Sequence, residues 1–294
     1  MVRKKITAYQ IFSIFNIVFM LFIILITAYP IYYIVLASFS DPGGLSRHVG
    51  LLWAPIKPYT TSAYETVFRN PLIITGFRNT AFVLTVGLLV NLTLTMLGAF
   101  FLTIKGPRLK NVIAIMIIFT MYFSGGLIPS YLNIKSLGLL DSLWALILPG
   151  AISTTNLIIM KSAFAAIPDS LIESARLDGA SYTQILIRVM VPLSKATIAV
   201  MVLYYGVGHW NEWFNASIYL RNGEKFPLQL VVRNILKLAG NSAMGSGAGM
   251  DEMAQLAELI KYALIVVTTT PILVLYPFLQ KHFVKGVMVG AIKG

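Results

Sequence analysis

The chain carries long apolar segments without charged side chains, and these segments constrain its fold more than any other feature. The first of them, residues 11–36, contains no Asp, Glu, Lys or Arg. A helix that crosses a bilayer needs about 20 predominantly apolar residues, and it satisfies its own backbone hydrogen bonds in the hydrocarbon. The sequence therefore predicts an all-α integral membrane protein with six transmembrane helices, at residues 11–36, 81–103, 112–132, 143–160, 193–214 and 260–279.

The composition agrees with a location in the bilayer. Charged residues make up 12% of the 294 residues, and the mean hydropathy is +0.79, whereas soluble domains carry about 25% charged residues. The first apolar run is longer than a signal-peptide core of roughly 7–15 residues, so we expect it to stay as an uncleaved span. No soluble part of domain size stands apart, and we expect one membrane domain over residues 1–294. The absence of cysteine excludes disulfides and thiolate metal sites.

The basic residues predict which side of the membrane each connection faces. Cytoplasmic loops are enriched in Lys and Arg, and an inside N-terminus places thirteen of the 23 Lys and Arg residues in the cytoplasm. Both termini and the loop 168–192 are then cytoplasmic. This asymmetry explains the net charge of +12 without nucleic-acid binding.

The loop between the fourth and fifth predicted spans is polar and well punctuated. Pro168 suits a first helical position, and Ser170 and Glu173 have the spacing of a capping box. Gly179 can end this helix in a left-handed turn, and Ser181 can cap a second short helix that runs toward Pro192. The pattern predicts a compact helical knob on which another protein can dock. Its small residues Ser174 and Ala175 would let another protein approach closely.

An aromatic and amide-rich segment lies at the outer end of the fifth predicted span. Its residues are Trp210, Asn211, Trp213, Phe214 and Asn215, with Glu212 between them. Indole rings stack on the C–H faces of sugars, and Asn side chains exchange hydrogen bonds with hydroxyl groups. At helical spacing the aromatic and the amide pairs would each share a face, which favours the wall of a sugar-binding cavity. The alternative is an aromatic belt at the membrane interface.

The apolar span at residues 112–132 is broken by glycines around Tyr122, Gly125 and Gly126. We include these three residues among the candidate cavity residues. A broken helix at membrane depth needs a place that is lined by water or buried in protein. The chain has no Gly-x4-Gly-Lys-Ser/Thr motif to bind nucleotide phosphates, and its three histidines do not have metal-ligand spacing. Almost no ionisable residue lies within a span, which argues against a proton- or sodium-coupled carrier.

The loop 168–192 resembles the EAA loop of ABC-importer permeases. That motif reads Glu-Ala-Ala, three residues, Gly, nine residues, then Ile-x-Leu-Pro, and it forms the contact with the ATPase. Glu173, Ala175, Gly179 and Pro192 match it in register. Ser174 replaces the first Ala, and Val189 and Val191 replace Ile and Leu, which are mild departures. The resemblance implies that the residues in contact with the ATPase are Glu173, Ser174, Ala175, Asp178, Gly179 and Pro192.

The whole chain resembles carbohydrate-type ABC-importer permeases of the maltose-permease superfamily. Within that superfamily it looks most like the oligosaccharide and polysaccharide permeases that include an alginate-importer permease. The resemblance is carried by residues 123–129, 173–192, 210–214 and 283–294. It implies a permease of the bacterial cytoplasmic membrane that moves an oligosaccharide or polysaccharide by alternating access.

The same resemblance implies a set of partners. These are a sister permease in a heterodimer, two ATPase subunits and an extracytoplasmic solute-binding protein. ATP and Mg²⁺ would be bound by the ATPase subunits, so this chain would need no cofactor and would not be an enzyme by itself. Two alternatives stay open at this point: an ABC permease for a peptide or polyamine, and a secondary transporter or intramembrane enzyme.

Overall fold

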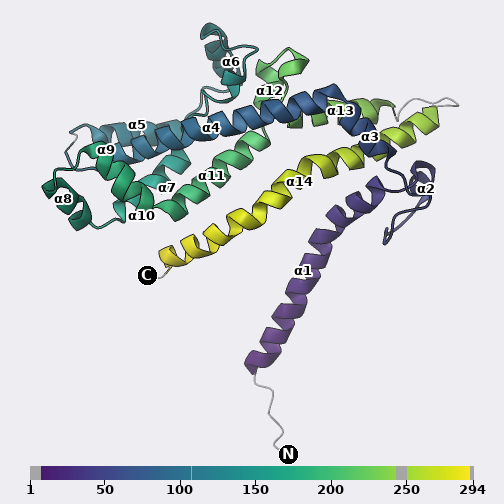
Figure 1. Cartoon of the computed structure of the whole chain (residues 1–294), viewed down its shortest axis with the longest axis horizontal. Helices are drawn as coiled ribbons and strands as arrows, with labels where there is room; N and C mark the ends of the chain where they lie inside the picture. Colours follow the sequence, from purple (N-terminus) through teal and green to yellow (C-terminus); the bar gives the residue numbers. More distant parts are fainter. Residues whose placement is uncertain (1–7, 107, 243–249, 292–294) are drawn as a thin grey trace, which may run out of the picture. The chain divides into compact units, whose positions relative to one another are not determined.

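The computed structural model describes residues 8–106, 108–242 and 250–291, and every regular element within these ranges is helical (Figure 1). The chain divides into two compact units. Unit 1 comprises residues 1–70 and 234–269, and unit 2 comprises residues 71–233 and 270–294. The helices α13 (Leu228–Ser242) and α14 (Met250–Ala291) each continue from one unit into the other. The last three residues of the resemblance at the C-terminus, 292–294, lie outside the described residues.

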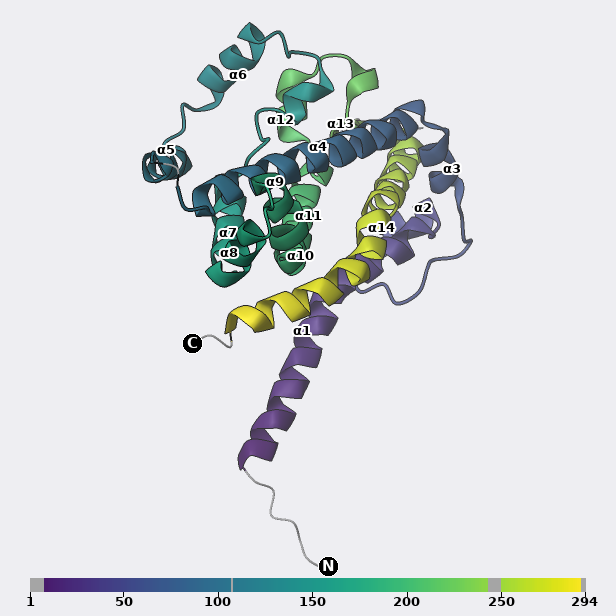
Figure 2. The ribbon, with the colours of Figure 1, turned by 60° about the vertical axis from the view of Figure 1, so that its left-hand side comes forward.

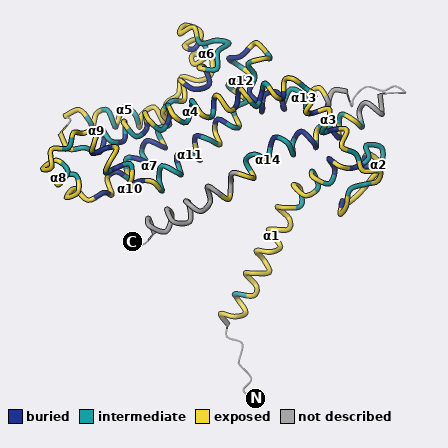
Figure 3. The backbone as a smooth tube through the Cα atoms, in the orientation of Figure 1, coloured by how far each residue is buried: buried dark blue, intermediate teal, exposed yellow. Residues whose placement is uncertain are grey.

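Unit 1 is built around the long helix α1 (Ala8–Ser38), which is followed by α2 (Pro42–Arg47) and α3 (Ser62–Arg69). The amino-terminal two thirds of α1 are apolar and exposed around the whole helix (Figure 3). Near its other end Tyr33 makes an edge contact with Tyr262 of α14, and the Tyr29 hydroxyl accepts a hydrogen bond from the backbone N–H of Leu52. A helix that is apolar on every side suits a lipid environment.

Unit 2 is organised along α4 (Pro71–Thr103), which packs against α7 (Thr154–Ala165) and α11 (Lys195–Trp210) (Figures 1 and 2). Its other helices are shorter. They are α5 (Lys110–Tyr122), α6 (Leu127–Ser136), the 3₁₀ helix η1 (Leu143–Leu146), α8 (Asp169–Leu177), α9 (Tyr182–Ile185), the π-helix η2 (Leu186–Met190), α10 (Val191–Leu193), α12 (Phe214–Tyr219) and η3 (Gly223–Lys225).

Two hydrophobic clusters pack on the two halves of α4. The carboxyl half, with Ala99 and Leu102, joins α7, α9, η2 and α11 in one cluster. The amino half, with Val83, joins α6, η1, α12 and the start of α13 in the other. Close packing here depends on small residues of α4, because a Cβ at Gly76 would lie 3.1 Å from the Cα of Leu228.

Three helices are long and apolar enough to cross a membrane: Tyr9–Ser38, Pro71–Thr103 and Gln255–Val274. Two further spans exist if each of two bent helix pairs is counted as one, namely Lys110–Tyr122 with Leu127–Ser136 at 119°, and Tyr182–Leu193 with Lys195–Trp210 at 85°. Among the described residues the lengths therefore support three to five spans, and the number six stays a prediction.

Three of the predicted spans are not continuous helices, and each break has a local cause. Residues 112–132 are interrupted at 123–126, where Gly126 has a φ of +85°. Residues 143–160 form a 3₁₀ turn and the start of α7, separated by a segment that contains Pro149 and Gly150. Residues 193–214 end as a helix at Trp210. The break at 123–126 was predicted from its glycines, whereas the sequence did not predict the interruptions before α7 and after Trp210.

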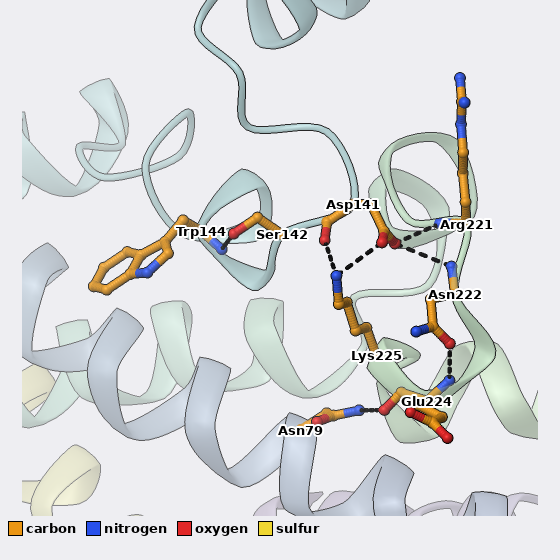
Figure 4. Close-up of polar contacts among 8 residues, drawn as sticks. All are labelled: Asn79, Asp141, Ser142, Trp144, Arg221, Asn222, Glu224 and Lys225. Atoms are coloured by element: carbon orange, nitrogen blue, oxygen red, sulfur yellow. Dashed lines mark hydrogen bonds and ion pairs between the residues drawn. The ribbon is translucent and has the colours of Figure 1, made fainter.

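Asp141 joins two irregular segments of unit 2 (Figure 4). Its carboxylate accepts hydrogen bonds from the backbone N–H groups of Arg221 and Asn222, both at 3.0 Å, and from the Lys225 ammonium at 2.8 Å. These bonds, those from Asn222 and Lys225 foremost, hold the pKa of the Asp141 carboxyl well below its usual range. The Asn79 side-chain amide of α4 donates to the backbone carbonyl of Glu224 at 2.7 Å. The loop before η1 is thereby fixed to α4.

We expect Asp141→Ala to lower the melting temperature of the purified protein by several degrees, and Asp141→Asn to lower it less. Asn keeps an acceptor, and like Asp it tolerates the φ of +55° at this position. A carboxylate with a lowered folded-state pKa stabilises the fold above its unfolded pKa and loses this effect as the pH falls through the folded value. The gap between wild type and Asp141→Asn should therefore narrow below pH 3.8. If Asp141→Ala melted at the same temperature as the wild type, the stabilising role of Asp141 would be contradicted. The same would follow if the difference in melting temperature between wild type and Asp141→Asn did not change in acid.

Candidate functional site

The loop 168–192 folds as two short helices around a left-handed glycine. Gly179 has a φ of +77°, its backbone N–H donates to the carbonyl of Arg176, and the N–H of Ala180 donates to the carbonyl of Ala175. This pair of bonds is the Schellman motif, in which a residue without a Cβ is strongly favoured. The predicted left-handed turn at Gly179 is confirmed.

The capping predictions for this loop have mixed outcomes. Ser181 caps α9: its hydroxyl accepts from the N–H of Gln184, and the Gln184 side chain accepts from the N–H of Ser181, which forms a complete capping box. The predicted capping box of Ser170 and Glu173 is wrong. Pro168 is the residue before α8, not its first residue, and α8 has no side-chain cap.

The helix α8 presents two different faces. Ile172 and Ala175 pack against the cluster formed by α4, α7 and α11. Glu173 and Ser174 are exposed, and Leu177 is 90% exposed. Asp178, Gly179 and Pro192 are exposed as well. The structure therefore places five of the six predicted contact residues on the surface, while Ala175 anchors the helix.

Two side-chain contacts join α8 to neighbouring elements of unit 2. Lys105, just beyond α4, forms an ion pair with Asp169 at 2.6 Å. The hydrogen bond and the charge of Asp169 raise the pKa of Lys105, although both side chains are largely exposed. Arg176 lies over the ring of Tyr182 in α9, 5.1 Å from its centre. The two short helices and the end of α4 thus form one connected piece.

A polar cavity of about 510 Å³ lies between the carboxyl end of α11 and the helices η1, α7 and α12. Its volume falls within the range of about 300–1,000 Å³ that is typical of small-molecule sites. Side chains that can exchange hydrogen bonds dominate its lining. They are Ser153, Asn156, Tyr204, Tyr205, His209, Glu212, Asn215 and Tyr219.

A buried hydrogen-bond network holds the wall of this cavity in place. The Asn91 side-chain amide of α4 donates to the carbonyls of Gly150 and Ala151 at 2.9 and 3.0 Å, and its carbonyl lies 2.7 Å from His209 Nε2. The Tyr205 hydroxyl lies 2.7 Å from the Thr95 hydroxyl and accepts from the backbone N–H of Ser153 at 3.0 Å. In the irregular segment before α7, the carbonyls of Gly150 and Ala151 and the N–H of Ser153 therefore have side-chain hydrogen-bond partners in place of helical ones.

Asn215 is the one of the five residues predicted in the aromatic and amide-rich segment that lines this cavity. Trp210 packs against Phe77, and its indole N–H is buried without a hydrogen-bond partner. Asn211 donates to the carbonyl of Val207 in its own helix.

The two remaining members of this segment pack away from the cavity lining. Trp213 lies under the guanidinium of Arg233, 3.4 Å from its ring centre, and makes an edge contact with Phe214. The prediction that residues 210 and 214, and 211 and 215, share helix faces was wrong, because α11 ends at Trp210 and α12 begins at Phe214.

The glycine-rich break predicted after the third span is present but lies away from the cavity lining. Tyr122 is 76% exposed at the end of α5, and Gly126 adopts a φ of +85° before α6. Gly125 has the ring of Pro129 as its close neighbour. None of the three lines the polar cavity.

Sequence reasoning missed most of the cavity residues, although a signal was present. Tyr205 and His209 lie four residues apart in an apolar helix, and Asn91 and Thr95 repeat this spacing on α4. Polar side chains one turn apart within apolar spans indicate an internal polar contact. Within the described ranges no group of three or more His, Asp or Glu residues is placed to hold a metal ion.

Residues 95–289 match the family described as "Binding-protein-dependent transport system inner membrane component". The chain is 41% identical over 285 residues to the protein LplC of Bacillus subtilis (strain 168), covering 97% of this chain and 96% of LplC. It is 38% identical over 281 residues to the polygalacturonan/rhamnogalacturonan transport system permease protein YtcP of the same organism, covering 94% and 96% of the two chains.

The fold matches a solved structure over nearly its whole length. A chain in the crystal structure of a bacterial ABC transporter involved in the import of the acidic polysaccharide alginate superposes with a TM-score of 0.83 at 31% identity, covering 96% of this chain and all of the other. A family match over most of the chain, full-length relatives and a full-length structural match agree with one another. The chain belongs to the inner membrane components of binding-protein-dependent transport systems, the permeases of ABC importers.

Proposed function

We propose that this chain is a permease subunit of an ATP-driven importer that moves an oligosaccharide or polysaccharide by alternating access. The observation that carries the substrate class is the full-length similarity to permeases named for saccharides, 38% identity to YtcP and 31% to the alginate-importer chain. The polar cavity supports it, because hydroxyl, amide and aromatic side chains are the groups that bind sugars. The peptide and polyamine alternatives receive no such support.

The proposed partners are a sister permease, two ATPase subunits and an extracytoplasmic solute-binding protein. The family is described as binding-protein-dependent, and a related fold occurs in the alginate transporter complexed with its pentasaccharide-bound periplasmic protein. ATP and Mg²⁺ belong to the ATPase subunits in this proposal. We also propose that the chain forms one membrane domain with six spans. Both termini and the loop 168–192 are proposed to be cytoplasmic, which the distribution of Lys and Arg supports.

The loop 168–192 is proposed to couple the ATPase to the cavity. Glu173, Ser174, Asp178, Gly179 and Pro192 would face the ATPase, and Ala175 would hold α8 on its support. The helices of the loop lead through the buried Ser194 directly into α11, whose far end carries His209 in the cavity lining. A partner shifts the equilibrium between two conformations of a protein only if it binds one of them better. The loop 168–192 must therefore bind one state of the ATPase more tightly than the other.

The substrate-facing proposal is centred on the observed cavity. Asn215 remains a proposed contact residue, together with the tyrosines and His209. Trp210, Asn211, Trp213 and Phe214 are proposed to support the segment that carries Glu212 and Asn215. Tyr122, Gly125 and Gly126 are proposed to shape the outer end of the third span.

The complex reconstituted in proteoliposomes tests the function as a whole. Addition of the binding protein loaded with a saccharide should stimulate ATP hydrolysis and drive uptake of that saccharide. The same complex without this chain should show neither response. Stimulation by a loaded peptide-binding protein, with no response to any saccharide, would refute the proposed substrate class.

We expect Gly179→Val to abolish most of the substrate-stimulated ATPase activity while membrane insertion persists. A Cβ at a left-handed position costs about 1–2 kcal/mol, and the strain falls on the turn that orients α8. Gly138→Val is the matched control. Gly138 has a φ of +68°, sits in the same Schellman geometry after α6, and like Gly179 has open space around its Cβ position.

The paired variants separate folding from coupling. Both should lose similar thermal stability, but only Gly179→Val should lose stimulated ATP hydrolysis per assembled complex. Normal stimulation in Gly179→Val, or an equal loss in Gly138→Val, would refute the coupling role.

Cysteine accessibility measures the proposed sidedness without background, because the chain has no native cysteine. Ser174 and Ser136 are both exposed in the structure. In intact cells Ser136→Cys should react with a membrane-impermeant thiol reagent, and Ser174→Cys should react after the membrane is permeabilised. Labelling of position 174 in intact cells would reverse the topology and remove the ATPase contact.

A further inference from the structure

An apolar pocket of about 390 Å³ lies beside the carboxyl end of α4, apart from the polar cavity. Its lining residues are Phe100, Phe101, Ile104, Gly106 and Tyr182. Phe101 is 37% exposed and Tyr182 is 56% exposed, so the pocket opens on the surface of unit 2. The ring of Tyr182, at the start of α9, meets that of Phe100 edge on, with 6.4 Å between the ring centres. One wall of the pocket therefore comes from α4 and the other from the loop 168–192 (Figure 1).

The pocket lies where an apolar helix ends. The helix α4 is long and apolar enough to cross a membrane, and Phe100 and Phe101 belong to its last turn. Ile104 and Gly106 follow that turn. The aromatic side of the pocket is thus on the side of the hydrocarbon, and the segment after α4 is on the side of the headgroups.

The segment that follows α4 is basic. Its charged residues are Lys105, Arg108 and Lys110. The Lys110 ammonium donates a hydrogen bond to the backbone carbonyl of Ile104 at 3.2 Å. Because Ile104 lines the pocket, this bond holds a positive charge at the edge of the pocket. An ammonium has three donors, so Lys110 keeps donors for a further partner.

The positive charge at this edge is not balanced by carboxylates. Residues 66–140 contain no Asp or Glu. Lys105 lines a neighbouring groove with one further cation and two carboxylates, and these four charges balance one another. They are Lys105, Arg176, Asp169 and Glu173. Within the part of the chain that the structure describes, Arg108 and Lys110 form no ion pair.

An apolar pocket with uncompensated cations at its edge fits a ligand that is apolar at one end and anionic at the other. Lys and Arg form charge-assisted hydrogen bonds with phosphate oxygens. The distribution of Lys and Arg predicts that this end of α4 is cytoplasmic. The cytoplasmic leaflet is anionic, and basic pockets between helices on that side bind lipid headgroups.

We propose that this pocket binds an anionic phospholipid of the cytoplasmic leaflet. An acyl chain lies against Phe100, Phe101 and Tyr182, and the phosphate is bound by Arg108 and Lys110. The proposal goes beyond the proposed function and rests on its topology. Because Tyr182 belongs to the loop 168–192, the bound lipid contacts the segment that is proposed to couple the ATPase to the cavity.

Photoreactive lipids test the proposal. The complex of this chain with its sister permease and ATPase subunits is placed in phosphatidylcholine nanodiscs. These contain a trace of phosphatidylglycerol or of phosphatidylcholine with the same photoreactive group in its acyl chain, and labelled peptides are identified by mass spectrometry. Phosphatidylglycerol should label the peptides that contain Phe101 and Tyr182 at least about tenfold more than phosphatidylcholine does. Each basic residue near the membrane surface contributes a factor of about five.

Substitution assigns this preference to the two cations. The double variant Arg108→Gln/Lys110→Gln should bring labelling by the two lipids close together, chiefly by lowering that of phosphatidylglycerol. The control is Arg188→Gln/Lys195→Gln. It removes two exposed cations on the same proposed side of the membrane, outside the pocket lining, and should leave the preference as in the wild type. The amount of assembled complex is measured for each variant.

A second measurement asks what covers the pocket in the complex. A photoreactive amino acid at Phe101 should cross-link to phospholipid. Cross-linking to the sister permease or to an ATPase subunit would overturn the proposal, as would equal labelling of the wild type by the two lipids. A preference that Arg108→Gln/Lys110→Gln does not change, or that the control loses equally, would also overturn it. The proposed function fails by a different result, since it is lost only if no saccharide-loaded binding protein stimulates ATP hydrolysis by the reconstituted complex.

Discussion

Irregular backbone inside an apolar chain needs hydrogen-bond partners, and this requirement governs unit 2. The segment between η1 and α7 cannot continue as a helix through Pro149 and Gly150, so its carbonyls are left without helical donors. Asn91, fully buried on α4, supplies donors to two of them. An unsatisfied backbone group in hydrocarbon costs several kcal/mol. The same Asn91 side chain also fixes the ring of His209, so the requirement that stabilises the fold also shapes the cavity.

The covalent path through α11 connects the two candidate sites. At one end, α8 rests on the core through Ile172 and Ala175 and is tied to the end of α4 by Lys105 and Asp169. At the other end, Tyr205 and His209 line the cavity and contact α4 through buried hydrogen bonds. A displacement of the loop 168–192 would therefore move α11, whose residues Tyr205 and His209 line the cavity. This arrangement is what a permease needs in order to convert movement of a partner into a change of access.

The sequence predicted those features that depend on neighbours in the chain. Gly179 and Ser181 were identified from local turn and cap chemistry, and both adopt the expected geometry. The capping role of Ser170 was wrong because Asp169 and Pro168 set the start of α8, and the Asp169 side chain binds Lys105. The break before α7 was not predicted, since apolar composition does not report whether a Pro-Gly pair finds a buried donor elsewhere. Asn91 and Gly150 are 59 residues apart, and no local pattern joins them. The cavity residues were missed for the same reason.

The contact between α8 and an ATPase subunit is the central claim of this account, and one cross-linking measurement addresses it directly. A photoreactive amino acid is placed at Ser174, on the exposed face of α8, in the assembled transporter. Irradiation should join this chain to the ATPase subunit, and the yield should change between nucleotide-free and ATP-bound complexes, because coupling requires that the contact differ between states. Cross-links to the solute-binding protein, or to no partner in an otherwise intact complex, would contradict the account.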